Sequence, residues 1–296
     1  MPQMRVTEGS ITTRVLANLQ RNMAKGARIQ EQLSSGKQIS RPSDSPTGTV
    51  SSMQLRGESR INQQYSRNAD DGMGWLETID STLTASMSQV NRVRDLTIQG
   101  LNSGTATPQS REALAIEVDN LRESLIGAAN TTYLGRPVFG GTTTGSAAYD
   151  SAGVYQGDSG EVLRTVGSNA QVRVGEAGPE VFGTGPDQLF AVLKSISTSI
   201  RSGDTPSLRD GLDKLDGAGK LLKSALSDVG ARYNRVSQMR DTSQDRTIAL
   251  KSQISNIEDI DLPQTIMEMQ LQETAYQAAL AATAKVIQPS LVDYLR

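Results

Sequence analysis

Residues 208–257 read LRDGLDKLDGAGKLLKSALSDVGARYNRVSQMRDTSQDRTIALKSQISNI. Apolar or small residues recur in this stretch at alternating intervals of four and three positions. They are Leu208, Leu212, Leu215, Gly219, Leu222, Leu226, Val229, Tyr233, Val236, Leu250, Ile254 and Ile257. Such spacing over many heptads is typical of a long helix that packs along one seam, as in a coiled coil. Roughly 50 helical residues extend about 75 Å.

The seam turns polar in its middle, where the same register passes through Arg240, Ser243 and Thr247. This stretch is either a weak point of the helix or a surface that meets another chain.

The first half of the chain carries matching stripes, which can share a core with the long helix. One stripe holds Leu76, Ile79, Leu83, Val90 and Val93, and the other holds Leu114, Val118, Leu121, Leu125 and Ala128. We therefore predict a mainly α fold, a long antiparallel helical bundle and coiled coil built from both halves of the chain.

Helix starts are marked by hydroxyl or carboxylate residues placed before a proline. Ser45, Thr107 and Thr205 each precede a proline, which suits the first helical position. Asp261 and Gln264 have the spacing of a capping box. Gly72 and Gly74 either interrupt the helix that follows Ser45 or only lower its stability.

Residues 135–186 differ in composition, since they hold a large share of the 27 glycines. Residues 162–166 and 171–174 alternate with the two-residue period of strands, and Val154–Tyr155 and Val181–Phe182 are weaker strand candidates. The pattern predicts a small β-rich insertion, with a disordered glycine-rich linker as the alternative. The predicted domains are terminal coiled-coil segments at 1–44 and 259–296, a helical bundle at 45–134 and 187–258, and this insertion.

Composition limits the chemistry that the chain can perform. The chain contains no Cys and no His, so thiolate nucleophiles, disulfides and the usual zinc sites are ruled out. A net charge of -2 argues against a dedicated nucleic-acid binder. No apolar run is long enough to span a membrane, and the first 20 residues do not resemble a secretory signal. We expect no catalytic, cofactor or metal site.

The two ends of the chain carry narrow apolar stripes. Each buries too little surface to stabilise an isolated helix, so each requires the other end or a neighbouring molecule as a partner. We predict a subunit or chaperone interface at Ile11, Val15, Leu19, Met23, Leu33, Ile266, Met269, Tyr276, Leu280, Ile287 and Leu291.

Other motifs carry weaker signals. Residues 35–37 share Ser-Gly-Lys with phosphate loops but lack the flanking Gly and Ser or Thr. Asn130 begins a formal glycosylation sequon. Three acidic groups, Asp70–Asp71, Asp213 with Asp216, and residues 258–261, suit solvated charge or capping better than cation binding. We expect none of these motifs to be functional.

Several segments together resemble the flagellin family. Residues 33–46 (LSSGKQISRPSDSP) resemble its N-terminal signature, residues 83–102 and 111–130 resemble two following helices, and residues 230–235 (GARYNR) resemble its C-terminal part. Within the family, residues 136–142 (RPVFGGT) and the ending 290–295 (SLVDYL) are more similar to the proteins that join hook to filament than to flagellin itself. Flagellin usually has Asp-Asp-Ala-Ala-Gly after the signature, where this chain has Pro42 to Gly48.

The resemblance implies an extracellular structural subunit of the bacterial flagellum, exported unfolded through the type III channel, and not an enzyme. It implies four partners: neighbouring copies, hook-associated protein 1, flagellin, and an export chaperone that binds the C-terminal stripe before secretion. No nucleic acid or membrane partner is expected. A short flagellin is the main alternative. An intracellular coiled-coil adaptor is a second alternative, and an enzyme built on the insertion is a third, although its carboxylates have no recognisable spacing.

Overall fold

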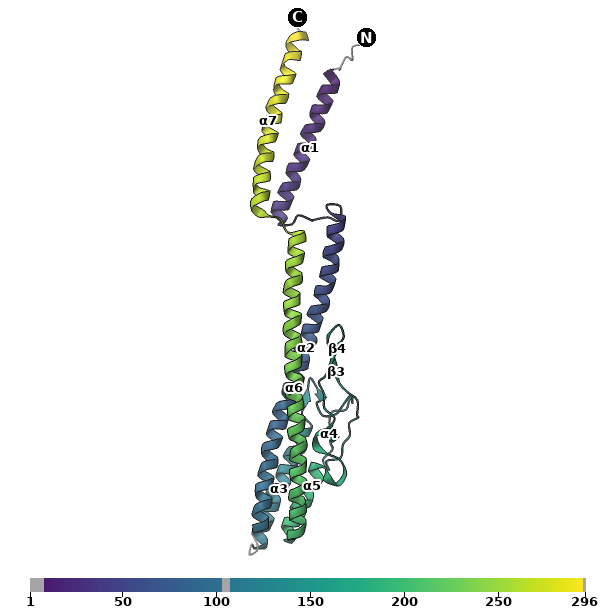
Figure 1. Cartoon of the computed structure of the whole chain (residues 1–296), viewed down its shortest axis with the longest axis vertical. Coiled ribbons are helices and arrows are strands. Elements are labelled where there is room, and N and C mark those ends of the chain that lie inside the picture. The colour runs from purple at the N-terminus through teal and green to yellow at the C-terminus, as the bar shows by residue number, and fades with distance from the viewer. Residues whose placement is uncertain (1–7, 103–106, 295–296) are drawn as a thin grey trace. The chain divides into compact units, whose positions relative to one another are not determined.

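The computed structural model describes residues 8–102 and 107–294, and most of them lie in helices (Figure 1). The helices are α1 (Glu8–Ser35), α2 (Pro46–Asn102), α3 (Pro108–Ala129), α4 (Gly178–Phe182), α5 (Leu189–Ser202), α6 (Thr205–Glu258) and α7 (Leu262–Tyr294), and a short 3-10 helix, η1, covers Gly185–Asp187. The strands are β1 (Thr132–Tyr133), β2 (Arg136–Pro137), β3 (Leu163–Gly167) and β4 (Ala170–Arg173). Among these described residues, no helix is both long and apolar enough to cross a membrane.

The described chain forms two compact units, a first unit of residues 8–60 with 247–294 and a second unit of residues 61–246. In the first unit, α1 and α7 lie side by side (Figure 1). In the second unit, α2, α3, α5 and α6 share one apolar core, which also takes in residues of the insertion. The predicted mainly α fold with a β-rich insertion is confirmed, while the three-part domain division stays a prediction.

Helix α6 confirms the long seam. Every position of the four-three register from Leu208 to Ile257 is buried or half-buried, and the helix continues without a break through Arg240 and Thr247. Ser243 is buried within the same register, so the polar stretch keeps the helix's inward face. The stripes of α2 and α3 also face inward, since every one of their predicted residues is buried or half-buried.

Most predicted helix starts are confirmed by their hydrogen bonds. The Ser45 hydroxyl accepts a hydrogen bond from the Gly48 N–H at 3.2 Å, and Thr107 does the same for α3. The Asp261 carboxylate accepts one from the Gln264 N–H at 3.1 Å, although the Gln264 side chain donates to Glu268 and leaves the box half formed. The prediction for Thr205 was wrong, because Asp204 accepts the hydrogen bond from the Ser207 N–H.

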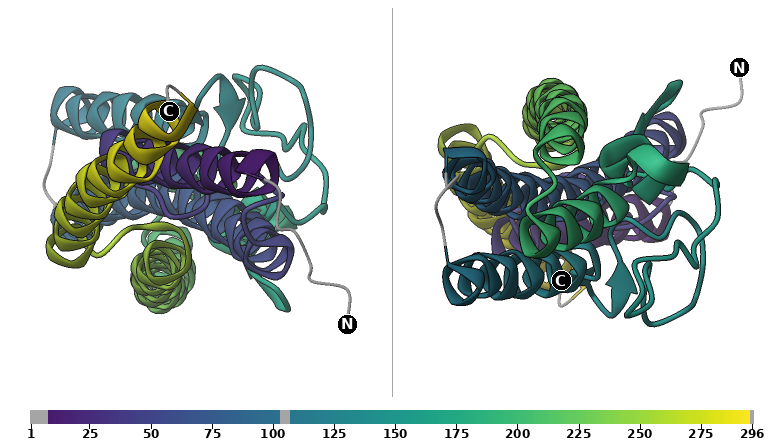
Figure 2. Two further views of the ribbon diagram at one scale, coloured as in Figure 1. Left: turned by 90° about the horizontal axis from the view of Figure 1, so that it is seen from above. Right: turned by 90° about the horizontal axis from the view of Figure 1, so that it is seen from below.

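The insertion is folded, and it packs on one side of the helices of the second unit (Figure 2). Strands β3 and β4 pair antiparallel close to the predicted bounds, and β1 pairs with β2. Two weaker strand predictions were wrong. Residues 181–182 belong to helix α4, where Pro179 suits the first turn, and Tyr155 makes only an isolated bridge with Tyr149. Periodicity over two residues is too short to separate strand from helix.

Gly72 and Gly74 do not interrupt α2, and both lie where the insertion approaches the helix. A Cβ at Gly74 would lie 2.5 Å from the Tyr133 hydroxyl oxygen, and a Cβ at Gly72 would lie 3.1 Å from Val174. The Tyr133 ring is itself packed edge-on against Trp75, with ring centroids 5.5 Å apart. These glycines therefore allow close approach of backbone and side chain.

Gly74→Ala should lower the free energy of unfolding of the second unit by about 1–3 kcal/mol, because the new methyl group must displace the Tyr133 ring. Gly217→Ala is the matched control. Its Cβ meets nothing within 4 Å, so the better helix propensity of Ala should raise stability by about 1 kcal/mol. Denaturant unfolding followed by fluorescence of Trp75, the one tryptophan of the chain, measures both changes. Equal effects of the two substitutions would contradict this role of Gly74.

Candidate assembly interface

The interface between α1 and α7 follows a four-three register on both helices. On α1 the inward positions are Val15, Leu19, Asn22, Gly26, Ile29 and Leu33, and on α7 they are Thr265, Met269, Gln272, Tyr276, Ala279 and Thr283. Ile29 and Thr265 are the buried members, and the rest are half-buried. The Gln272 side chain donates a hydrogen bond to the Asn22 carbonyl oxygen at 2.9 Å. The seam therefore mixes apolar, small and polar residues, and its apolar area is small.

The structure divides the predicted interface residues into two groups. Val15, Leu19, Leu33, Met269 and Tyr276 lie in the seam between α1 and α7. Met23, Ile266 and Leu280 are exposed instead, because the register steps through Asn22, Thr265 and Ala279 in their place. Ile11, Ile287 and Leu291 lie outside the described side chains. The structure does not test the role of either group in binding another molecule, so the interface stays a prediction.

An exposed apolar row remains on the outside of the α1–α7 pair after the two helices have packed. It consists of Leu16 and Met23 on α1, and of Leu262, Ile266 and Leu280 on α7, whereas Met267 and Leu271 are exposed on other sides of α7. Leu271 is 65% exposed and Leu280 is 44% exposed. Sequence reasoning missed Leu16, Leu262, Met267 and Leu271, because it followed one stripe on each helix. The seven-residue spacing from Leu16 to Met23 and the four-residue spacing from Leu262 to Ile266 were the signals that could have found Leu16 and Leu262.

Most of the residues that resemble the flagellin signature lie in a joint, which we define as residues 36–45 and 259–261. Here the chain leaves α1 for α2, and α6 for α7. The Gln38 N–H donates to the Glu258 carbonyl oxygen at 2.6 Å, and the Ile260 N–H donates to the Gly36 carbonyl oxygen at 3.2 Å. Gly36 has a φ of 69°, the left-handed region that favours glycine at the end of a helix.

Ion pairs hold the two halves of the joint together. The Lys37 ammonium contacts Asp259 and lies 3.6 Å from Glu258, whose carboxylate accepts a hydrogen bond from Arg56 at 2.6 Å. The hydrogen bond with Asp259 raises the pKa of Lys37, and the same bond lowers the pKa of Asp259. Burial opposes ionisation of Glu258, but hydrogen bonds from Arg56 and Ser52 outweigh it and lower its pKa. The charged side chains of the joint are therefore ionised at neutral pH, and their ion pairs link its two halves.

The loop of the joint has its own internal support. The Asp44 carboxylate accepts hydrogen bonds from the Arg41 N–H at 2.8 Å and the Ser40 N–H at 3.2 Å, which lower its pKa. A cavity of about 520 Å³ lies beside this loop, lined by side chains that include Arg28, Ile39 and Ile257. The Ser-Gly-Lys motif therefore serves the turn after α1, with Lys37 engaged by carboxylates.

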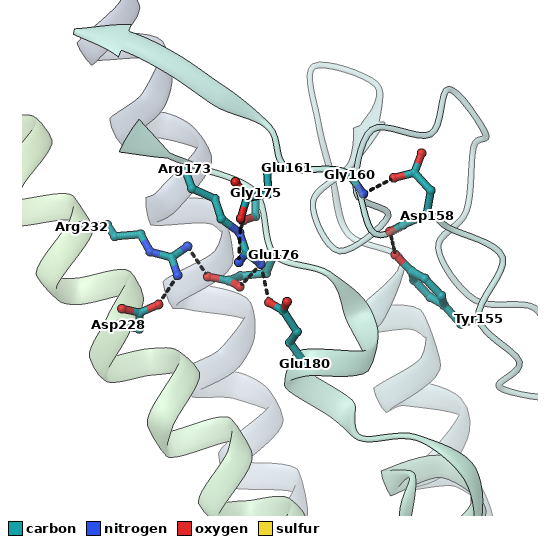
Figure 3. A network of polar contacts seen from close by, with 10 residues as sticks. All are labelled: Tyr155, Asp158, Gly160, Glu161, Arg173, Gly175, Glu176, Glu180, Asp228 and Arg232. Carbon is teal, nitrogen blue, oxygen red and sulfur yellow. Dashed lines mark hydrogen bonds and ion pairs between the residues drawn. The ribbon is translucent and has the colours of Figure 1, made fainter. Parts of the chain in front are cut away.

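The second unit fastens its insertion to α6 through an anchor cluster of charged residues (Figure 3). The cluster consists of Glu161, Arg173, Glu176, Glu180, Asp228 and Arg232. Glu176 is 4% exposed and accepts hydrogen bonds from Arg232 at 2.6 Å and from Arg173 at 3.0 Å. Burial raises the pKa of Glu176 even though both arginines oppose that rise. Arg232, within the family-like GARYNR segment, is therefore a structural link between helix and insertion.

Other predicted polar sites turn out to be structural contacts. Asp71 pairs with Arg164 at 2.5 Å and Asp216 pairs with Arg94 at 2.9 Å, so these carboxylates are more than solvated charge. The Asn130 side chain bonds three backbone groups of residues 148 and 149 at 2.8 Å, so the folded sequon does not present a free amide. Within residues 8–102 and 107–294, no group of acidic side chains could hold a metal ion.

Comparison with known proteins gives consistent matches over most of the chain. Residues 8–144 match the model of the bacterial flagellin N-terminal helical region, and residues 212–295 match that of the C-terminal helical region. Flagellar hook-associated protein 3 of Salmonella typhimurium is 24% identical over 301 residues, covering 93% of this chain and 95% of that protein. A flagellin of Bacillus subtilis is 25% identical over 303 residues, covering 96% of this chain and 97% of that protein.

The fold has solved counterparts as well. The crystal structure of flagellar hook-associated protein 3 from Legionella pneumophila superposes with a TM-score of 0.62 and 14% identity, covering 69% of this chain and 98% of that one. At this identity the likeness shows the fold alone.

Proposed function

The chain belongs to the bacterial flagellin family, and on that premise we propose that it is an extracellular structural subunit that joins the hook of the flagellum to the filament. The observation that carries the proposal is the exposed apolar row on the α1–α7 pair. Full burial of one such side chain stabilises an assembly by roughly 1.5–3 kcal/mol. Repetition of the same heterologous contact around a tube then holds the subunits together through many modest contributions.

We further propose that the terminal segments become stably ordered on assembly. The seam between α1 and α7 contains Asn22, Gly26, Thr265 and Gln272, so its apolar burial offsets only part of the conformational entropy that ordering removes. Packing of the exposed apolar row against neighbouring copies would supply the remainder. Before export, the part of the row on α7 is the proposed contact for a chaperone.

The purified monomer should lose its terminal segments to a protease before its second unit is cut. Residues 1–40 and 262–296 should be cleaved well before residues 108–130, which lie in the apolar core. Limited proteolysis followed by mass spectrometry measures the order of cleavage. Equal protection of all three segments in the monomer would contradict ordering on assembly.

Electron microscopy of a deletion strain separates the junction role from that of a short flagellin. Loss of a junction protein leaves hooks without filaments and releases unpolymerised flagellin into the medium. Loss of a filament subunit shortens or removes filaments without that release. Immunogold labelling of intact flagella gives the complementary test, since a junction protein is labelled at one point and a filament protein along the whole length. Retention of the protein in the cytosol would instead favour an intracellular adaptor.

A further inference from the structure

The β1–β2 hairpin carries Leu134 at its tip in an unfavourable setting. Leu134 has a φ of 49°, and in the described part of the chain no other residue except glycine has a positive φ. Two-residue hairpin turns favour Asn or Gly at such a position, because the left-handed backbone crowds a larger side chain. Leu134 is also 79% exposed, more than any other large apolar side chain among the described residues. A strained backbone that presents an apolar side chain to solvent indicates a contact with another molecule.

The hairpin holds Leu134 in a fixed position on the second unit. Tyr133 and Arg136 pair across the two strands, and the Tyr133 ring packs against Trp75 with ring centroids 5.5 Å apart. The Arg136 guanidinium lies 5.8 Å from the centre of the Trp75 ring and makes no ion pair within the described residues. The hairpin therefore offers an exposed leucine next to a cation that has no carboxylate partner.

A groove between α2 and α6 has the complementary features. Its volume is about 320 Å³, and Leu76 and Val229, both fully buried, form an apolar floor. Glu77 and Asp80 are exposed at its rim, one helical turn apart, and in the part of the chain that the structure describes neither carboxylate makes an ion pair or a hydrogen bond. The groove thus suits an apolar side chain that arrives with a positive charge beside it.

The hairpin and the groove lie on roughly opposite sides of α2. Tyr133 packs against Gly74 and Trp75, whereas the groove is lined by Leu76 and by residues 77 and 80. At 3.6 residues per turn, these two sets of positions point on average in roughly opposite directions. The hairpin tip therefore faces away from the groove of its own molecule, and a neighbour that binds at one site leaves the other open.

Building on the proposed function, we propose that Leu134 of one copy inserts into the groove between α2 and α6 of a neighbouring copy. The insertion brings the charge of Arg136 close to Glu77 and Asp80. Burial of Leu134 in this contact offsets the strain of its backbone, which the lone molecule bears without compensation. Because the two sites face different ways, the contact is heterologous and repeats from copy to copy instead of closing into a dimer.

Cross-linking in isolated flagella tests the contact directly. The chain has no cysteine, so Leu134→Cys combined with Asp80→Cys introduces the only two thiols. A short bismaleimide should then produce a ladder of covalent multimers. Val154→Cys combined with Asp80→Cys is the matched control, since Val154 is an exposed apolar residue elsewhere in the insertion, and it should give no ladder. Absence of the ladder, or equal ladders from both pairs, would overturn the proposal.

Leu134→Asn gives a second readout that does not depend on thiols. Asn tolerates the left-handed backbone, so the melting temperature of the purified chain should stay the same or rise. The protein retained on flagella should nevertheless fall by about tenfold or more, which corresponds to the burial of one leucine. Val154→Asn should leave retention unchanged. Full retention of Leu134→Asn would overturn the proposal, and so would a lower melting temperature, since Leu134 would then serve the fold of one molecule.

The contact and the junction role can fail separately. A protein that immunogold labels along the whole filament and still forms the ladder would refute the junction role and leave this contact standing. A protein labelled only at the junction that forms no ladder would refute the contact and leave the junction role standing.

Discussion

Arg232→Ala is expected to lower the free energy of unfolding of the second unit by about 3 kcal/mol. The substitution leaves the buried Glu176 with Arg173 as its remaining cation, at 3.0 Å. Because Glu176 is removed from water, the lost partner cannot be replaced by solvent, and the ionised carboxylate becomes costly. The insertion should loosen from α6, and denaturant unfolding followed by Trp75 fluorescence measures the loss.

The stability lost in Arg232→Ala should depend on pH. Burial already raises the pKa of Glu176, and removal of Arg232 takes away an interaction that opposes this rise. A carboxyl whose pKa is higher in the folded state than in the unfolded state binds protons more tightly when folded, so its contribution to stability is lost as pH rises through the folded pKa. The deficit of Arg232→Ala should therefore be largest at neutral pH and should shrink as acid protonates Glu176.

Arg94→Ala is the matched control for Arg232→Ala. Arg94 also forms an ion pair from one helix to another, with Asp216 at 2.9 Å, but both side chains are 45% exposed. Water solvates the remaining carboxylate, so the change in stability should be much smaller and should fall further in salt. Equal losses for the two arginines would show that burial of Glu176 does not determine the strength of the anchor cluster.

Leu280→Asp should abolish assembly while the second unit stays folded. Leu280 belongs to the exposed apolar row, so a carboxylate there should leave the seam between α1 and α7 intact. In the assembled tube the same charge would be buried without a partner, at a cost of several kcal/mol for each copy. The measurement is swimming motility together with the release of unpolymerised flagellin. Unfolding should remain as in the unmodified protein when followed by Trp75 fluorescence.

Tyr276→Asp separates the two surfaces of α7. Tyr276 lies half-buried in the seam, so its substitution should disturb the pairing of α1 with α7 as well as assembly. Circular dichroism should show a larger loss of helix for Tyr276→Asp than for Leu280→Asp, because only Tyr276 lies in the seam. Normal motility of the Leu280→Asp strain would contradict the assembly role of the exposed apolar row. Collapse of the second unit in that variant would contradict the independence of the two units.

The amino-acid sequence by itself determined the long helices, their inward faces and most of their starts. These features are local: the four-three spacing from Leu208 to Ile257 and the caps at Ser45, Thr107 and Asp261 depend on residues a few positions apart. Only the tertiary structure decided that Glu176 meets Arg232, that Lys37 meets Asp259, and that Leu280 remains exposed while Ala279 enters the seam. Some of these contacts join residues that lie far apart in the chain, and others depend on which side of an apolar helix a partner covers. The periodicity of the sequence encodes neither the distant partner nor the covered side.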